Sequence, residues 1–158
     1  MSARPDTLTQ MRQMGAGDLD RVSAIERVIY SHPWTRGNFA DSLAAGYHCW
    51  VLERDGLLAG YVVTMIAAGE AHLLNLSVAA PLQRQGLGSE LLRFVLQLAR
   101  DCAAVTIYLE VRESNAAARA LYARHGFSEV GTRKGYYPAS YPANEGREDA
   151  VTMTRVLI

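Results

Sequence analysis

Apolar side chains recur at two spacings along this chain, and the two spacings predict different elements. Apolar positions three and four residues apart, typical of a helix with one buried face, occur over 19–29, 35–45, 86–100 and 115–125. Apolar runs rich in β-branched and aromatic residues, typical of strands, occur over 8–14, 47–53, 57–66, 71–78, 104–110, 127–132 and 150–156. The pattern therefore predicts strands interspersed with helices.

Turn residues between these segments indicate how the strands connect. Arg54-Asp55-Gly56 and Gly69-Glu70 each separate two strand segments by a tight turn. Three strands joined in this way form an antiparallel meander, whereas the later strands alternate with helices. A loop rich in tyrosine, proline and glycine is expected over Gly135–Gly146. We expect one α/β domain over 1–158, with a core over about 8–156 and a mixed, mostly antiparallel sheet flanked by helices on both faces.

The composition adds limits on location and partners. A chain of 158 residues that is 49% hydrophobic and 20% charged is expected to be globular, and its formal net charge of zero argues against a nucleic-acid partner bound through a broad basic field. The chain has no apolar run of membrane-spanning length and no recognisable signal peptide. Cys49 and Cys102 lie far apart in sequence, so we expect both to be reduced and buried in a soluble, cytoplasmic protein. The four histidines show no metal-ligand spacing, so no metal site is expected.

The segment from Pro81 to Leu92 joins a predicted strand to a predicted helix and contains two closely spaced glycines. Gly86 and Gly88 lack a Cβ atom, so a ligand can approach the backbone there, and Arg84 adds a cationic donor. A helix that begins after such a loop presents free backbone N–H groups to an anion. The segment therefore predicts a phosphate or pyrophosphate site, with an ordinary glycine-rich turn as the alternative.

Three phosphate-binding patterns can be compared with this segment. A Walker loop ends in Gly-Lys-Ser or Gly-Lys-Thr, whereas this segment has Gly88-Ser89-Glu90. A dinucleotide fingerprint needs a third glycine where Leu91 stands, and its first glycine would follow the strand directly. The third pattern, Gln/Arg-x-x-Gly-x-Gly/Ala, is met by Gln83, Gly86 and Gly88. This pattern resembles the coenzyme A pyrophosphate loop of the GCN5-related N-acetyltransferases.

Polar residues downstream of the loop are candidates for chemistry. Glu110 closes an apolar strand, and in open α/β sheets ligand chemistry concentrates beyond the carboxyl ends of strands. Taken alone, however, Glu110 is better interpreted as a solvated glutamate paired with Arg112. Ser114 and Asn115 begin the last helical segment, and capping that helix is expected to be the main role of Ser114. Tyr122 lies within the same segment, where a core aromatic residue is the alternative to a catalytic one.

Taken together, these residues resemble the second half of the GCN5-related N-acetyltransferase domain. The motif is Leu109-Glu110-Val111-Arg112-x-Ser114-Asn115-x-x-Ala118-x-x-Leu121-Tyr122-x-x-x-Gly126-Phe127. A closer resemblance, to the RimI subgroup that acetylates the N-terminal amine of ribosomal protein S18, rests on further matches at 75–78, 83–88, 133–138, 146–150 and Met153. The resemblance runs from Asp18 to Met153 and implies the fold predicted above.

The resemblance implies direct transfer of an acetyl group from acetyl-CoA to the N-terminal alanine of ribosomal protein S18, without an acyl-enzyme. It implies that Glu110 is the general base and that Tyr122 is the general acid, which protonates the coenzyme A thiolate. A backbone N–H near Val78, where the family's strand bulges, would hold the thioester carbonyl. The implied cofactor-binding residues are Leu76, Ser77 and Val78 on the strand, Arg84, Gln85, Gly86, Leu87, Gly88 and Ser89 in the pyrophosphate loop, and Asn115 beside the pantetheine arm.

Several positions on the acceptor side depart from the subgroup or have more than one interpretation. The segment 138–145 is longer than expected, and Gly135 stands where a polar residue is more usual. Glu148 and Asp149 either recognise a basic acceptor or form a solvated turn. The aromatic residues that either line the acceptor groove or pack over the sheet are Trp34, Tyr136 and Tyr137. The alternatives are therefore an acetyltransferase acting on a lysine side chain or a small amine, and an acyl-CoA-binding sensor without turnover.

Overall fold

The computed structural model describes residues 8–138 and 147–158. The strands in these ranges are β1 (Thr9–Gln13), β2 (His48–Arg54), β3 (Leu57–Ala67), β4 (Glu70–Val78), β5 (Thr106–Arg112), β6 (Ser128–Pro138) and β7 (Arg147–Val156). The helices are α1 (Leu19–Ile29), α2 (Arg36–Ala44), α3 (Leu87–Asp101) and α4 (Ala116–Arg124), with two short 3-10 turns, η1 (Ala16–Asp18) and η2 (Ala80–Leu82). None of the helices within the described ranges combines the length and the apolar character needed to span a bilayer.

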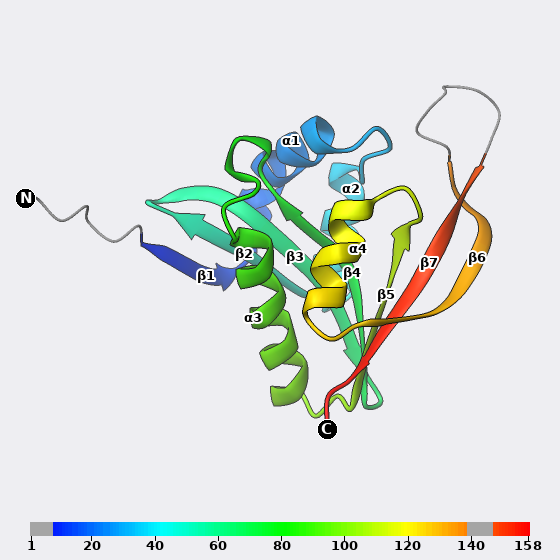
Figure 1. The fold of residues 1–158 in the computed structure, drawn as a ribbon. Coiled ribbons are helices and arrows are strands. Elements are labelled where there is room, and N and C mark those ends of the chain that lie inside the picture. The colour runs from blue at the N-terminus through cyan, green and yellow to red at the C-terminus, as the bar shows by residue number, and fades with distance from the viewer. Residues whose placement is uncertain (1–7, 139–146) are drawn as a thin grey trace, which may run out of the picture.

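The strands form one sheet in the order β1-β2-β3-β4-β5-β7-β6 (Figure 1). Neighbouring strands are antiparallel except β4 and β5, which are parallel. Gly56 and Gly69 adopt φ of 80° and 79°, a left-handed conformation that glycine enters without steric cost, and so they permit the tight turns of the meander. The crossover through α3 then makes β5 parallel to β4. The predicted α/β fold with a mixed, mostly antiparallel sheet is confirmed.

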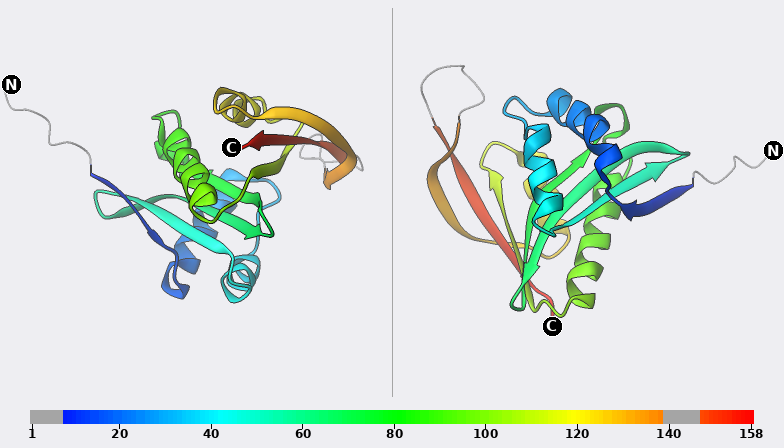
Figure 2. Two further views of the ribbon diagram at one scale, coloured as in Figure 1. Left: turned by 90° about the horizontal axis from the view of Figure 1, so that it is seen from below. Right: turned by 180° about the vertical axis from the view of Figure 1, so that it is seen from behind.

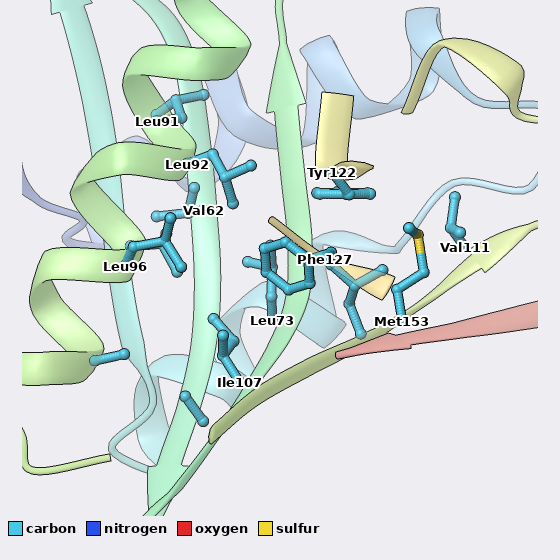
Figure 3. Close-up of a cluster of buried hydrophobic side chains, with 14 of the residues drawn as sticks. Val62, Leu73, Leu91, Leu92, Leu96, Ile107, Val111, Tyr122, Phe127 and Met153 are labelled. Atoms are coloured by element: carbon cyan, nitrogen blue, oxygen red, sulfur yellow. The ribbon is translucent and has the colours of Figure 1, made fainter. Parts of the chain in front are cut away.

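Helices cover both faces of the sheet, and each face has its own apolar core (Figure 2). On one face α1 and α2 pack on β2 and β3, and Val22, Phe39 and Tyr61 are fully buried there. On the other face α3 contributes six buried residues at helical spacing, and α4 contributes Tyr122 (Figure 3). Each leucine buried in this way contributes about 1.5–3 kcal/mol, so the apolar stripe of α3 holds that helix on the sheet.

The strands β4 and β5 separate along their length. They pair only where Glu70–His72 faces Thr106–Tyr108. Beyond these residues β4 continues beside β3 as far as Val78, and β5 continues beside β7 as far as Arg112, so the carboxyl ends of the two strands lie apart (Figure 1). The pairing of β3 with β4 skips Leu74, and such a bulge adds local twist. The sheet therefore has an opening between the ends of its two parallel strands.

Two local predictions are wrong. Cys102 is exposed, whereas Cys49 is buried as expected. The predicted loop over Gly135–Gly146 is shorter than expected, because β6 continues to Pro138 and β7 already begins at Arg147. Gly135, with φ of 61°, lies within an irregularity in the β6–β7 pairing and does not end the strand. The remainder of that loop, including most of the long segment 138–145, lies outside the described residues.

Candidate active site

Backbone groups of β4 face the opening between β4 and β5. Antiparallel partners alternate between pairs that exchange hydrogen bonds and pairs that do not. Because Ala79 N–H donates to a β3 carbonyl at 2.8 Å, the peptide groups of Leu76 and Val78 point away from β3. Their carbonyls accept from the Tyr30 hydroxyl at 3.4 Å and from Gln83 Nε2 at 3.1 Å. The N–H groups of Leu76 and Val78 point the same way, as the binding of a carbonyl or an oxyanion requires.

The predicted pyrophosphate loop lies at the start of α3, beyond the carboxyl end of β4. Arg84 and Gly86 adopt φ of 63° and 83°, so the chain turns twice through the left-handed region before Leu87 begins the helix. Among the described residues no side chain caps α3 at Gly86, which leaves the N–H groups of its first turn for an anion. The Ser89 hydroxyl lies 3.1 Å from His125 Nε2 at the end of α4. This arrangement fits a pyrophosphate group.

One side-chain hydrogen bond joins the loop to a neighbouring hairpin. Arg54 Nη1 donates to Gln85 Oε1 at 2.5 Å and so joins the loop to the β2–β3 hairpin. A Cβ atom at Gly88 would lie 3.4 Å from Leu121 Cδ2, in van der Waals contact, so packing against α4 does not by itself require a glycine there. Gly88 therefore keeps only the role in ligand approach that its spacing predicts.

A cleft of about 240 Å³ lies where the end of α1 meets the start of α4. Its lining consists of Ile29, Tyr30, Ser31, His32, Arg112, Ser114 and Asn115. Asn115 is the N-cap of α4, because its side chain accepts a hydrogen bond from Ala118 N–H at 3.1 Å. Ser114 N–H donates to Glu148 instead. The prediction that capping is the main role of Ser114 is therefore wrong, and Asn115 caps the helix while it lines the cleft.

Glu110 lies on β5, and its side chain is 7% exposed. Its Oε2 lies 2.7 Å from His72 Nε2, and its Oε1 lies 3.7 Å from Arg133 Nη2. Arg112, the partner expected for a solvated glutamate, pairs with Glu148 at 3.1 Å. Because His72 belongs to the last pair of β4 and β5, Glu110 is a nearly buried carboxylate at the point where the two strands diverge.

Tyr122 lies on the other face of the sheet. Leu109 and Val111 of β5 are buried in the core under α3 and α4, so Glu110 between them points to the opposite face. Tyr122 belongs to that core together with Val78 and Val111, at the diverging ends of β4 and β5 (Figure 3). Burial raises the pKa of Tyr122, so its hydroxyl stays protonated and can donate a proton. Glu110 and Tyr122 therefore flank the opening from opposite faces.

The model of the acetyltransferase (GNAT) family matches residues 19–127, which is more than half of the chain. The chain belongs to the GNAT acetyltransferase family. It is therefore an acetyl-CoA-dependent N-acetyltransferase. The fold and the layout of the predicted pyrophosphate loop agree with this membership, since the loop follows the strand beside the opening.

Named relatives are similar to this GNAT chain along most of its length. The chain is 38% identical over 136 residues to the ribosomal protein bS18-alanine N-acetyltransferase of Escherichia coli K12, which covers 86% of this chain and 89% of that one. It is 34% identical over 141 residues to the enzyme of the same name from Haemophilus influenzae, and the match covers 89% of this chain and 94% of that one. The crystal structure of the ribosomal-protein-S18-alanine N-acetyltransferase from Escherichia coli matches with a TM-score of 0.87 at 35% identity, over 95% of this chain and 94% of that one.

The two acidic residues at the start of β7 form contacts within the GNAT domain. Glu148 accepts from Arg112 at 3.1 Å and from Ser114 N–H at 3.0 Å, and Asp149 accepts from Gly135 N–H at 2.8 Å. Burial acts to raise the pKa of Glu148, but the hydrogen bonds from Ser114 and Arg112 outweigh it, and the pKa is lowered. Both carboxylates therefore join β7 to its neighbours, which favours a structural role over recognition of a basic acceptor.

The aromatic residues proposed for the acceptor groove lie in two different places. The Trp34 ring packs against Phe39 at 5.2 Å between centroids, in the core under α1 and α2. Tyr136 and Tyr137 lie on β6 with their rings 4.8 Å apart, and Arg112 lies over the ring of Tyr137 at 4.6 Å. The tyrosine pair thus lies on the face that carries Glu110, whereas Trp34 packs against the core under α1 and α2.

The bulge of β4 also differs from expectation. It lies at Leu74, four residues before Val78, so the prediction of a bulge near Val78 is wrong. The backbone N–H of Val78 nevertheless points into the opening, because the regular alternation of the β3–β4 ladder turns it away from β3. A candidate oxyanion donor thus arises from ladder geometry.

Sequence reasoning missed a buried carboxylate on α1. Glu26 is 2% exposed, and it accepts from the Tyr61 hydroxyl at 2.7 Å, from Trp34 N–H at 3.0 Å and from Asn75 Nδ2 at 3.1 Å. A glutamate four residues after Val22, on the inward face of an apolar helix, is the signal that could have found it. A glutamate at such a position is unusual, because burying a carboxylate costs free energy unless hydrogen-bond donors surround it.

The hydrogen bonds of Glu26 continue to the edge of the cleft. Asn75 Oδ1 accepts from the Ser77 hydroxyl at 2.7 Å, and Ser77 Oγ lies 2.7 Å from the Tyr30 hydroxyl. Tyr30 lines the cleft and also donates to the carbonyl of Leu76. Ser77, expected to bind the cofactor, is therefore buried within a network that fixes β4 to α1.

Proposed function

We propose that this GNAT enzyme transfers the acetyl group of acetyl-CoA to the α-amine of the N-terminal alanine of ribosomal protein S18. The observation that carries the proposed chemistry is the placement of Glu110 and Tyr122 on opposite faces of the sheet, beside the opening between β4 and β5. The acceptor is supported by the relatives named for bS18, the first of which is 38% identical over 86% of the chain.

Glu110 supplies the basic group of the reaction. An α-amine has an ordinary pKa of about 8, so it is mostly ammonium at neutral pH and cannot attack a carbonyl. Glu110 removes a proton directly or through a water molecule, and the free amine then attacks the thioester carbonyl without an acyl-enzyme. The N–H groups of Leu76 and Val78 stabilise the oxyanion that forms, since they already point into the opening.

Tyr122 supplies the proton for the leaving group. Breaking the C–S bond releases the coenzyme A thiolate, and the neutral Tyr122 hydroxyl protonates it. The segment Arg84–Ser89 binds the pyrophosphate through the first turn of α3, and Asn115 contacts the pantetheine arm from the cleft. Ser77 acts indirectly, through the network that orients Leu76.

The acceptor is tested by measuring release of the coenzyme A thiol. One peptide carries the N-terminal sequence of ribosomal protein S18 beginning with alanine, and a matched peptide has the same sequence with its α-amine blocked and an internal lysine added. We expect thiol release with the first peptide and none above background with the second. Release from the second peptide alone would indicate lysine acetylation, and equal release from both would indicate that the enzyme does not distinguish the two amines. No release from either would refute the proposed acceptor.

The roles of the two side chains are tested by Tyr122→Phe and Glu110→Gln. General acid or base catalysis contributes about 10²–10⁴-fold, so each variant should lower kcat by at least about 10²-fold. The dissociation constant of acetyl-CoA, measured by calorimetry, should change little, because neither side chain belongs to the pyrophosphate loop. Tyr47→Phe is the matched control, because Tyr47 is a partly buried tyrosine that packs on the core under α1 and α2, away from Tyr122. Unchanged turnover in Tyr122→Phe would remove its role as the acid.

A further inference from the structure

His72 forms the shortest contact of the Glu110 carboxylate. Its Nε2 lies 2.7 Å from Glu110 Oε2, and the two side chains are 18% and 7% exposed. A nitrogen and an oxygen at this distance share a proton, because two lone pairs would repel. The resting pair therefore holds at least one proton, which lies between Nε2 and Oε2.

The second ring nitrogen of His72 has no hydrogen-bond partner within residues 8–138 and 147–158. The ring stacks on Tyr108 with 4.3 Å between centroids and 23° between planes, which fixes its orientation. His72 and Tyr108 form the last pair of β4 and β5, so the ring lies at the start of the opening. Nδ1 is therefore left to accept a proton.

The groups around the pair carry charges of both signs. Arg133 Nη2 lies 3.7 Å from Glu110 Oε1 and offsets the carboxylate charge. Burial raises the pKa of Tyr137 to about 12, with smaller effects from Tyr136 and the Glu110 charge, so its phenol is neutral. Glu70 lies two residues before His72 on the same side of β4. An imidazolium at His72 would thus have the Glu110 carboxylate in contact and a second, exposed carboxylate on the same side of the strand.

We propose that the base of this enzyme is the His72–Glu110 pair and that the proton taken from the acceptor rests on the imidazole. This inference rests on the proposed function. Imidazole is the side chain that ordinarily gains a proton near neutral pH, and a neighbouring carboxylate stabilises the imidazolium.

Two protons leave the acceptor ammonium in each turnover. One N–H bond of the ammonium breaks, and the His72–Glu110 pair changes from one proton to two. The amine nitrogen bonds to the thioester carbon, and the C–S bond breaks as the tetrahedral species collapses. Tyr122 gives its proton to the thiolate, and the second amine proton replaces it. The pair then releases its added proton to water, so each turnover releases one proton.

The variant His72→Gln separates proton acceptance from hydrogen bonding. A glutamine amide can still donate to Glu110, but it cannot take up a proton. At pH 7 we expect kcat/KM for the S18 peptide to fall by at least about tenfold, with the KM for acetyl-CoA unchanged. At about pH 9.5 the loss should shrink to about threefold or less, because most of the α-amine is already deprotonated there.

A second variant and a matched control make the test independent of folding. In His72→Ala, added imidazole should restore part of the lost activity at pH 7, which a purely structural defect would not allow. His48→Gln is the matched control, because His48 lies on β2, which β3 separates from β4, and urea unfolding checks that each variant is folded.

Two results would refute the role of His72 and leave the proposed function standing, provided that the wild-type protein is active and Glu110→Gln is impaired. One is unchanged activity of His72→Gln at pH 7. The other is an equal loss at both pH values without rescue by imidazole. Absence of thiol release by the wild-type protein with the S18 peptide would instead refute the proposed function.

Discussion

The substitution Tyr61→Phe tests how the buried Glu26 is accommodated. Tyr61 is fully buried, and its hydroxyl donates to Glu26 Oε1 at 2.7 Å. Within the described residues Glu26 has no ion pair, so its acceptors are satisfied by Tyr61, Asn75 and the N–H of Trp34. Burial, and then the charge of Glu26, raise the pKa of Tyr61, so the hydroxyl remains a donor.

The size of the effect follows from what the substitution removes. Phenylalanine keeps the ring and its edge-on contact with Phe39, at 5.5 Å between centroids, so no large cavity forms. What is lost is one hydrogen bond to a charged acceptor, which is typically worth about 1.5–3 kcal/mol. A loss of about 2 kcal/mol raises the unfolding constant about 30-fold. For a chain of this size it lowers Tm by about 4–8 °C.

Urea unfolding monitored by tryptophan fluorescence measures this loss. We expect the midpoint to fall while the m-value stays constant, because the substitution changes stability and not compactness. Tyr122→Phe is the control, since the Tyr122 hydroxyl has no hydrogen bond within the described residues and its loss should cost little. In a Glu26→Gln background the cost of Tyr61→Phe should fall to about 1 kcal/mol, the value for a neutral hydrogen bond. A cost below about 0.5 kcal/mol in the wild-type background would refute the reasoning.

Two further predictions concern packing and pH. A Cβ atom at Gly60 would lie 2.7 Å from the Ser77 carbonyl oxygen, so Gly60→Ala should destabilise the protein by about 1–3 kcal/mol. A Cβ atom at Gly131 would have no atom of the described residues within 4 Å, so Gly131→Ala should change stability by less than about 0.5 kcal/mol. Equal effects of the two substitutions in urea unfolding would contradict this prediction. The hydrogen bond from Arg12, ahead of other causes, lowers the pKa of Asp18, so its stabilising contribution should be present above about pH 4, the unfolded-state value, and be lost as the pH falls below it. Asp18→Asn should flatten this acid part of the stability profile, and an unchanged profile would exclude the contribution.

Most elements of the fold could be predicted because the signals that define them are local. Helical spacing in 19–29 and 86–100 and the Asp-Gly turn before β3 depend on neighbours within a few residues, and the structure has elements at all these places. The longer β6 could not be predicted in the same way. Gly135 at φ of 61° is a turn signal in the sequence, but here it lies in an irregularity whose hydrogen bonds come from β7.

The same distinction between local and long-range signals applies to the candidate site. The loop spacing, the glutamate, the asparagine and the tyrosine were all recognisable as a motif, because each belongs to a short stretch with its own chemistry. Their relation in space was not recognisable. That Glu110 pairs with His72 and not with Arg112 depends on how β4 and β5 align across 38 residues, which no local pattern records.

By itself the sequence determined the order of the elements, the layered α/β class and the types of residue available for chemistry. Only the tertiary structure decided where β4 and β5 part, which face each side chain takes there, and which donors surround Glu26 and Glu110. The physical reason is that propensity and periodicity act over one or two turns of chain. Strand divergence and buried hydrogen-bond networks depend instead on packing between segments that are distant in sequence.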